Sequence, residues 1–269
     1  MASVQIEMGT AKRITATAMK IRKQDITFQE DGHTYTYGGE LLTGVTTILK
    51  VRQQDFLKWW TVKLMYETLL PKLAEVQGID QKTWEAILLE AKKAHTTKSK
   101  EALVSGKIAH DWIEKYIKAK LNGEKEYGEP VEDEKAEQAI KQFLSWENKN
   151  KVEWFYSELV VCDPINKYAG TIDFIAKVNG VNTLGDFKTS SMISEDYFLQ
   201  TAAYQNCIES IIEDGEKIEQ RLILRIPKDG SEFETRIVPT PYDFDVKTFL
   251  ALREVHRWNL FIENQIKTK

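Results

Sequence analysis

Two aspartates stand at positions that would bring them together on one β-hairpin. Apolar and polar residues alternate over residues 168–189 on both sides of Asn179-Gly180. This dipeptide favours a two-residue hairpin turn, because both residues tolerate positive φ. Such a turn places Asp173 directly opposite Asp186, and directly opposed side chains share a face with Cβ atoms roughly 4.5–5.5 Å apart. The hairpin therefore predicts two facing carboxylates.

Facing carboxylates repel each other unless a shared proton or a cation neutralises them. Oxygen ligands at this separation suit Mg²⁺ or Mn²⁺ better than zinc. Lys188 follows Asp186 by two residues and so lies on the same face of the strand. There it could orient or deprotonate an attacking water, or stabilise the charge that develops during phosphodiester hydrolysis. The alternative is a surface hairpin on which Lys188 neutralises two solvated aspartates, and the spacing alone leaves both interpretations open.

The pattern of apolar residues predicts the elements that position this hairpin. Short strands and turns are expected within residues 25–50, and helices from about residue 53 to 149, including 101–120 and 133–147. The second half of the chain predicts strands, helices and a turn in the following order: strands 154–161, 168–178 and 182–189, a helix at 194–212, strands 220–226 and 233–238 around a turn at 228–230, and a helix at 241–266. This order predicts an α/β fold, with a mixed central sheet flanked by helices and a helical annex.

Length and composition limit the classes of protein to consider. The chain has 269 residues, of which 42% are hydrophobic, so a sizeable core is expected and general disorder is excluded. Three parts are expected: a flexible segment at 1–23, N-terminal strands and helical annex at 24–150, and the core at 151–269. Two cysteines without paired spacing argue against a disulfide scaffold or a cysteine zinc site.

No apolar run approaches a membrane span, and the start lacks the apolar region of a signal peptide. We therefore expect an intracellular protein, cytoplasmic or phage-encoded, with organelle targeting left open. The net charge of −4 argues against a protein that coats nucleic acid through bulk positive charge. The charge is uneven, however. Residues 92–120 hold eight lysines against three acids, whereas residues 122–137 hold seven acids against two lysines. The lysine-rich segment is either a solvated helix face or the rim of a basic channel.

Four short motifs in a fixed order resemble the RecB-type branch of the PD-(D/E)XK nuclease superfamily. They are GKIAH at residues 106–110, GTID at 170–173, GDFK at 185–188 and QTAAY at 200–204. A weaker similarity to phage and mitochondrial exonucleases of this type extends over residues 42–60. A single D-x-K motif carries little information, whereas four motifs in this order and spacing are a strong signal.

The resemblance implies a restriction-endonuclease-like core and a metal-dependent deoxyribonuclease that uses Mg²⁺ or Mn²⁺. Asp173 and Asp186 would bind the metal, together with the backbone carbonyl of Phe187. Lys188 would be the catalytic lysine, and His110 would complete the metal site from the helical annex. The D-x-K motif begins with Asp rather than the Glu of much of the superfamily, which is ordinary in this branch.

The resemblance also assigns roles to further residues. Gln200 and Tyr204 share a helix face and would position the substrate strand or its phosphate. Glu158 would be the additional acid that some members carry on the preceding strand. The implied substrate is DNA, as single strands or duplex ends, and the implied setting is DNA repair or recombination, with a helicase or recombination protein as a partner. The oligomeric state is not indicated.

Two alternative functions are compatible with the same residues. A DNA-binding module that keeps the fold without cleaving is the first alternative, and a metal hydrolase that is not a nuclease is the second. Taken alone, His110 is an ordinary helix histidine, and only the motif set gives it a role. His33, His95 and His256 have no convergent partners in the sequence. The pair Trp59-Trp60 could stack bases, although buried helix aromatics are commoner.

Overall fold

The computed structural model describes residues 19–52, 55–75, 80–124, 128, 130–190, 192–213, 215–227 and 231–267. The turn expected at 228–230 lies outside these residues, as do residues 1–18 of the expected flexible segment. Residues 19–22 are held in place, contrary to expectation. Arg22 N–H donates to the Ile211 carbonyl at 2.7 Å, and Met19 is buried in the core.

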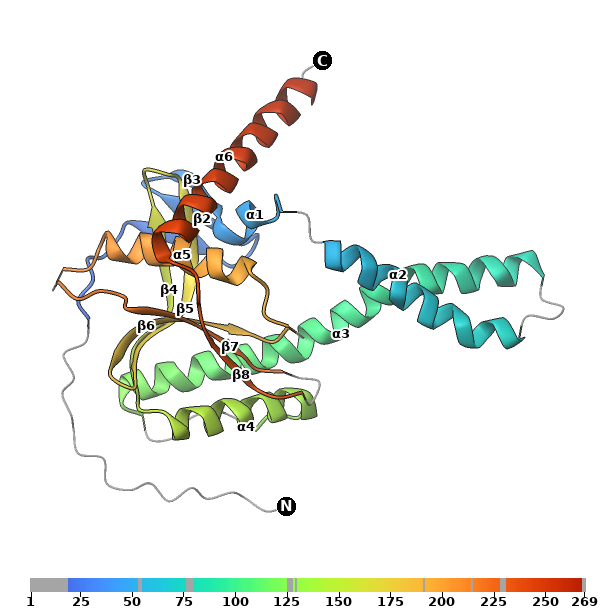
Figure 1. The fold of residues 1–269 in the computed structure, drawn as a ribbon, viewed down its shortest axis with the longest axis horizontal. Helices are drawn as coiled ribbons and strands as arrows, with labels where there is room; N and C mark the ends of the chain where they lie inside the picture. Colours follow the sequence, from blue (N-terminus) through green and yellow to red (C-terminus); the bar gives the residue numbers. More distant parts are fainter. Residues whose placement is uncertain are drawn as a thin grey trace.

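An eight-stranded mixed sheet forms the centre of the fold (Figure 1). Its order is β1-β2-β3-β5-β6-β7-β8, with β4 paired to β5. β3 runs parallel to β5 and β6 runs parallel to β7, and the other pairs are antiparallel. The strands are β1 (Ile26–Gln29), β2 (Thr34–Tyr37), β3 (Glu40–Gly44), β4 (Val152–Asp163), β5 (Tyr168–Val178), β6 (Val181–Lys188), β7 (Gln220–Arg225) and β8 (Glu234–Ile237). The predicted α/β class with a mixed sheet and a helical part is confirmed.

Helices pack on both faces of the sheet. They are α1 (Val45–Leu49), α2 (Asp55–Leu69), the 3-10 helix η1 (Leu70–Glu75), α3 (Gln81–Asn122), α4 (Glu134–Lys149), α5 (Asp196–Glu209) and α6 (Tyr242–Lys267). α3 is one helix of 42 residues, where separate helices were expected. It can continue because no proline interrupts it. It begins at the Asp80 cap and ends at Gly123, which has the left-handed φ of 73°.

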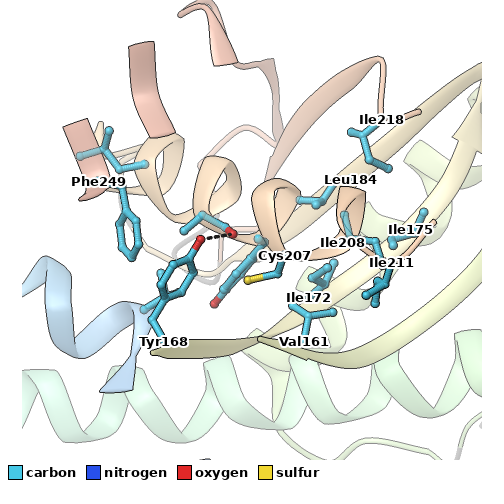
Figure 2. Close-up of a cluster of buried hydrophobic side chains, with 14 of the residues drawn as sticks. Val161, Tyr168, Ile172, Ile175, Leu184, Cys207, Ile208, Ile211, Ile218 and Phe249 are labelled. Carbon is cyan, nitrogen blue, oxygen red and sulfur yellow. Dashed lines mark hydrogen bonds between the residues drawn. The ribbon is translucent and has the colours of Figure 1, made fainter. Parts of the chain in front are cut away.

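Each face of the sheet has its own apolar cluster. One cluster joins α1, α5 and α6 to the sheet and includes Ile172, Ile208 and Phe249 (Figure 2). The other joins α3 and α4 to the opposite face and includes Ile117, Phe143, Phe174 and Leu224. Since α3 and α4 share this second cluster with β5 and β7, the division expected at residue 150 crosses a continuous core.

Only part of the expected annex stands away from the sheet. α2 and the amino-terminal part of α3 project from the body as a helical arm (Figure 1). Leu64 of α2 and Ala91 of α3 are buried, whereas Trp59 is 76% exposed. Trp59 is thus not a core aromatic. None of the helices in the described part of the chain combines the length and apolarity that a membrane span requires.

Candidate metal and catalytic site

The hairpin of β5 and β6 has the predicted turn. Asn179 and Gly180 have φ angles of 52° and 88°, as a two-residue turn with positive φ at both positions requires. Five cross-strand pairs run from the turn to Phe174 opposite Gly185, in the register that the sequence predicted. The backbone ladder ends there. At the next position the Asp173 carboxylate accepts the Phe187 backbone N–H at 2.7 Å.

His110 and two carboxylates from three elements form one cluster. His110 Nε2 of α3 lies 3.4 Å from Asp173 Oδ2 of β5 and 3.8 Å from Glu158 Oε1 of β4. One potential ligand atom from each residue lies within 4.8 Å of the others. The structure therefore brings together His110 and Asp173, which belong to the motifs, and Glu158, the additional acid.

The strand backbone is distorted where this cluster forms. Glu158 has φ 51°, a left-handed conformation that a non-glycine residue in a strand rarely adopts. Across from it, β5 changes the face to which it turns its apolar residues. Ile172 belongs to the cluster under α5, whereas Phe174, two residues further, belongs to the cluster under α3 and α4. Residues two apart in a regular strand share a face. Strain of this kind gathers at functional sites.

Asp186 and Lys188 form the second half of the site. The Asp186 side chain is 1% exposed, and its Oδ2 lies 2.5 Å from Lys188 Nζ. Asp186 Oδ2 is a fully buried oxygen, and Lys188 Nζ is the charged group that lies against it. Lys188 Nζ also lies 4.8 Å from the ring centroid of Tyr197.

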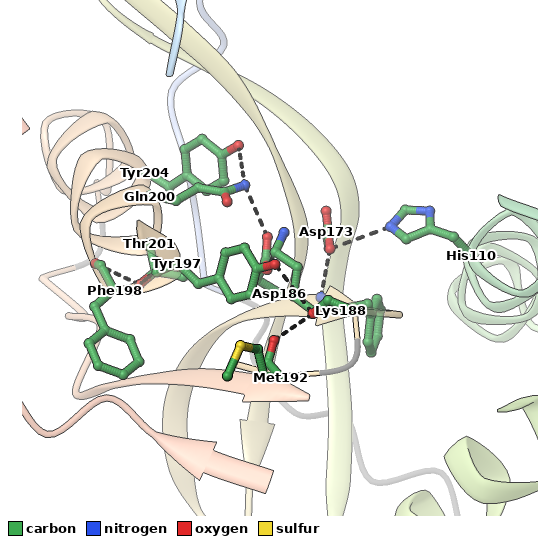
Figure 3. Close-up of polar contacts among 12 residues, drawn as sticks. His110, Asp173, Asp186, Lys188, Met192, Tyr197, Phe198, Gln200, Thr201 and Tyr204 are labelled. Atoms are coloured by element: carbon green, nitrogen blue, oxygen red, sulfur yellow. Dashed lines mark hydrogen bonds and ion pairs between the residues drawn. The ribbon is translucent and has the colours of Figure 1, made fainter. Parts of the chain in front are cut away.

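Helix α5 places Gln200 and Tyr204 beside Asp186 (Figure 3). Gln200 Nε2 donates to Asp186 Oδ1 at 3.2 Å and to the Tyr204 hydroxyl at 2.9 Å. Both side chains are buried. Gln200 therefore orients a carboxylate, and its contact with the substrate strand or phosphate stays a prediction. The Tyr204 ring packs so closely on Gly170 that a Cβ there would lie 2.3 Å from Tyr204 Cε1.

Burial and mutual repulsion disfavour the ionised form of two carboxyl groups at the site. Burial, helped by Asp173, raises the pKa of Glu158 to about 8. Burial, again helped by Asp173, raises the pKa of Asp186 to about 7 against the opposing effect of Lys188. Burial would raise the pKa of Asp173 and lower that of His110, but their mutual contact outweighs it. The pKa of Asp173 is lowered, and that of His110 is raised to about 9. In the absence of a cation, protons neutralise this cluster.

A divalent cation would replace those protons. His110, Glu158 and Asp173 offer one imidazole nitrogen and carboxylate oxygens within reach of a single ion. The buried Oδ2 of Asp186, which faces Lys188 Nζ, offers a further oxygen. Such a set suits Mn²⁺ or Mg²⁺. His110 also lies close to Asp111 and Glu114. Glu114 already pairs with Lys118, so the cluster around Asp173 is the better site. The backbone carbonyl of Phe187 stays a predicted ligand.

Two lysines of the lysine-rich segment 92–120 form ion pairs with acids in the structure. Lys118 pairs with Glu114 at 2.5 Å, and Lys120 pairs with Glu147 at 2.7 Å. The side chains of residues 95–103 lie outside the described part of the chain. A continuous basic channel along α3 therefore stays a prediction.

Sequence reasoning missed three side chains that lie beside the cluster. Phe28, His33 and Tyr35 of the β1–β2 hairpin line a cavity that also reaches His110 and Asp173. The alternation that places Phe28 and Tyr35 on short strands was visible in the sequence, and His33 lies in the turn between these strands. Their position depends on the parallel pairing of β3 with β5, which brings the hairpin beside residues far along the chain.

Comparison with known proteins assigns no family to this chain. A scan against models of known protein families finds no match, and a search of curated protein sequences finds no significant relative.

Proposed function

We propose that this protein is a Mg²⁺- or Mn²⁺-dependent deoxyribonuclease that hydrolyses phosphodiester bonds, as an exonuclease on single strands or duplex ends. The observation that carries the proposal is the convergence of His110, Glu158 and Asp173 beside the ion pair of Asp186 and Lys188. Buried carboxylates in mutual repulsion add nothing to stability. Their concentration beside a lysine is explained by a cation and a charged substrate.

The residues of the chain have separable tasks in this proposal. His110, Glu158, Asp173 and Asp186 would hold the cation, which when bound supplies a polarised phosphate and a water of lowered pKa. The Phe187 N–H fixes Asp173, and Gln200 fixes Asp186. Preorganised groups of this kind need no rearrangement during the reaction.

Lys188 is suited to stabilise charge. Burial would lower its pKa, but Asp186 and Asp173 outweigh burial and raise it. The lysine therefore stays protonated at neutral pH. A protonated Lys188 cannot deprotonate water, but it can hold an attacking water or a phosphate oxygen as negative charge develops. The raised pKa of Lys188 therefore favours a role in stabilising charge over a role as the base that deprotonates water.

The assignment of DNA as substrate rests on the four motifs that resemble the RecB-type branch. The test is cleavage of labelled single-stranded and duplex DNA by wild-type protein with Mg²⁺, with Mn²⁺ and with EDTA. Asp186→Asn and Lys188→Ala should each reduce the rate by about 10²-fold or more. Lys167→Ala is the matched control, because Lys167 pairs with Glu40 far from the site. Absence of metal-dependent cleavage by the wild type, or site variants as active as Lys167→Ala, would refute the proposal.

A further inference from the structure

A cavity of about 260 Å³ extends from the carboxylate cluster to the β1–β2 hairpin. His110, Glu158 and Asp173 contribute to its lining, and Phe28 and His33 contribute to the side formed by the hairpin. A substrate phosphate held at the carboxylates would therefore place a neighbouring part of the substrate inside the cavity. The chemistry of the hairpin side indicates which part.

The hairpin side of the cavity is a wall of three aromatic residues, Phe28, His33 and Tyr35. The rings of Phe28 and Tyr35 are stacked with centroids 4.8 Å apart, and the His33 ring meets Phe28 edge-on at 5.0 Å. Tyr35 is buried, and its hydroxyl lies 3.1 Å from Thr171 Oγ1 of β5. The wall is thus tied to the strand that carries Asp173.

His33, which belongs to this wall, has an unusual backbone conformation. Its φ is 49°, in the left-handed region, and its N–H donates to the Glu30 carbonyl across the turn. The residue is exposed, so burial does not impose this conformation. A strained and solvent-facing aromatic residue at the mouth of a cavity is a candidate for ligand contact.

The wall suits an uncharged planar ring. Among the residues that line the cavity, all of them within the described part of the chain, none is Lys or Arg. A phosphate on the hairpin side of the cavity would therefore have no lysine or arginine to bind it. An engineered cavity of about 150 Å³ holds benzene, so a cavity of about 260 Å³ has room for a nucleobase.

We propose that the cavity between the carboxylate cluster and the Phe28–His33 wall binds the base of a nucleotide adjoining the scissile phosphate, stacked on the wall. This inference rests on the proposed nuclease function and specifies its substrate. A base in this cavity cannot be paired with a complementary strand. The substrate at the moment of cleavage is therefore an unpaired nucleotide, from a single strand or a frayed duplex end.

The test compares a single-stranded oligonucleotide with the same strand carrying abasic residues on either side of the cleaved bond. Stacking of one base on an aromatic side chain is worth about tenfold or more in affinity. The wild type should therefore cleave the intact strand with a kcat/KM about tenfold above that of the abasic strand. Phe28→Ala should bring this ratio close to one, mainly by raising KM for the intact strand.

Phe28→Leu separates stacking from folding, because leucine keeps an apolar side chain but lacks the aromatic face. It should reduce the ratio while its thermal unfolding stays close to that of the wild type. Phe244→Ala is the matched control, since Phe244 lies exposed on α6, and it should keep the full ratio. Equal cleavage of both strands by active wild type, or an undiminished ratio in Phe28→Leu, would overturn the inference and leave the nuclease proposal standing. Cleavage of neither strand would overturn both.

Discussion

The substitution Asp186→Asn should stabilise the metal-free protein at alkaline pH. The pKa of the Asp186 carboxyl rises from an ordinary value of 3.8 to about 7 in the folded protein. This difference corresponds to about 4 kcal/mol of unfolding free energy at a pH well above 7. Asparagine has the same shape and carries no charge, so it removes the cost of ionising a carboxyl that is 1% exposed.

The direction in which this stability difference changes with pH follows from proton binding. A carboxyl with a raised pKa keeps its proton longer in the folded state, so its stabilising contribution is complete below pH 3.8 and is lost as the pH rises through 7. Asparagine also leaves Lys188 without its closest anion, which offsets part of the gain. We therefore expect a net stabilisation of about 1–3 kcal/mol at pH 8, and a value about 2 kcal/mol smaller at pH 5.5.

Urea unfolding in EDTA at the two pH values measures this effect. Asp245→Asn is the control of opposite sign, because Asp245 pairs with the buried Arg221 at 2.9 Å. Breaking that pair leaves a buried charge alone and should destabilise the protein at both pH values. The reasoning is refuted if Asp186→Asn is less stable than the wild type at pH 8, or if its gain is the same at pH 5.5.

Four further outcomes are expected. Gly170→Ala places a Cβ 2.3 Å from the Tyr204 ring, so it should lower stability by about 1–3 kcal/mol and reduce kcat in a DNA-cleavage assay. Gly44→Ala, whose nearest contacts would be 3.7 Å away, should be tolerated in urea unfolding. Tyr204→Phe removes the hydroxyl that accepts from Gln200 and should lower kcat with little change in KM, whereas a change in KM alone would argue for substrate contact. Mn²⁺ should raise the melting temperature of the wild type more at pH 8 than at pH 5.5, because at the lower pH it must displace protons from Glu158 and Asp186; a shift independent of pH would contradict binding at these carboxylates.

Local features of the sequence were enough to predict the hairpin that carries Asp173, Asp186 and Lys188. The Asn179-Gly180 turn depends on two adjacent residues, and strand alternation then determines which side chains share a face. The neutralisation of the carboxylates could be predicted in kind, since repulsion between opposed charges follows from the register. The structure adds that protons and His110 do this in the absence of a cation.

Other features depend on contacts between distant parts of the chain, which the periodicity of a single segment does not specify. The left-handed φ of Glu158 occurs where the apolar residues of the neighbouring strand β5 switch from one face of the sheet to the other. The residue types at this position do not predict it. The burial of Gln200 depends on how α5 lies on the sheet. The cavity beside Phe28 and His33 exists only because β3 pairs with β5.

Several features that oppose stability lie together at this site. Glu158 has a strained backbone, and Asp186 is a buried carboxyl with a raised pKa. Gly170 leaves room for the Tyr204 ring, where any larger residue would collide. A structural ion pair elsewhere in the same core, Arg221 with Asp245, needs no such strain. Because proteins tolerate local destabilisation mainly where function requires it, this concentration favours a working site over a structural network. It also explains how a chain with a net charge of −4 could act on a polyanion. The contacts that would hold the substrate are a cation at the carboxylates, Lys188 and an aromatic wall, and none of them depends on the net charge of the chain.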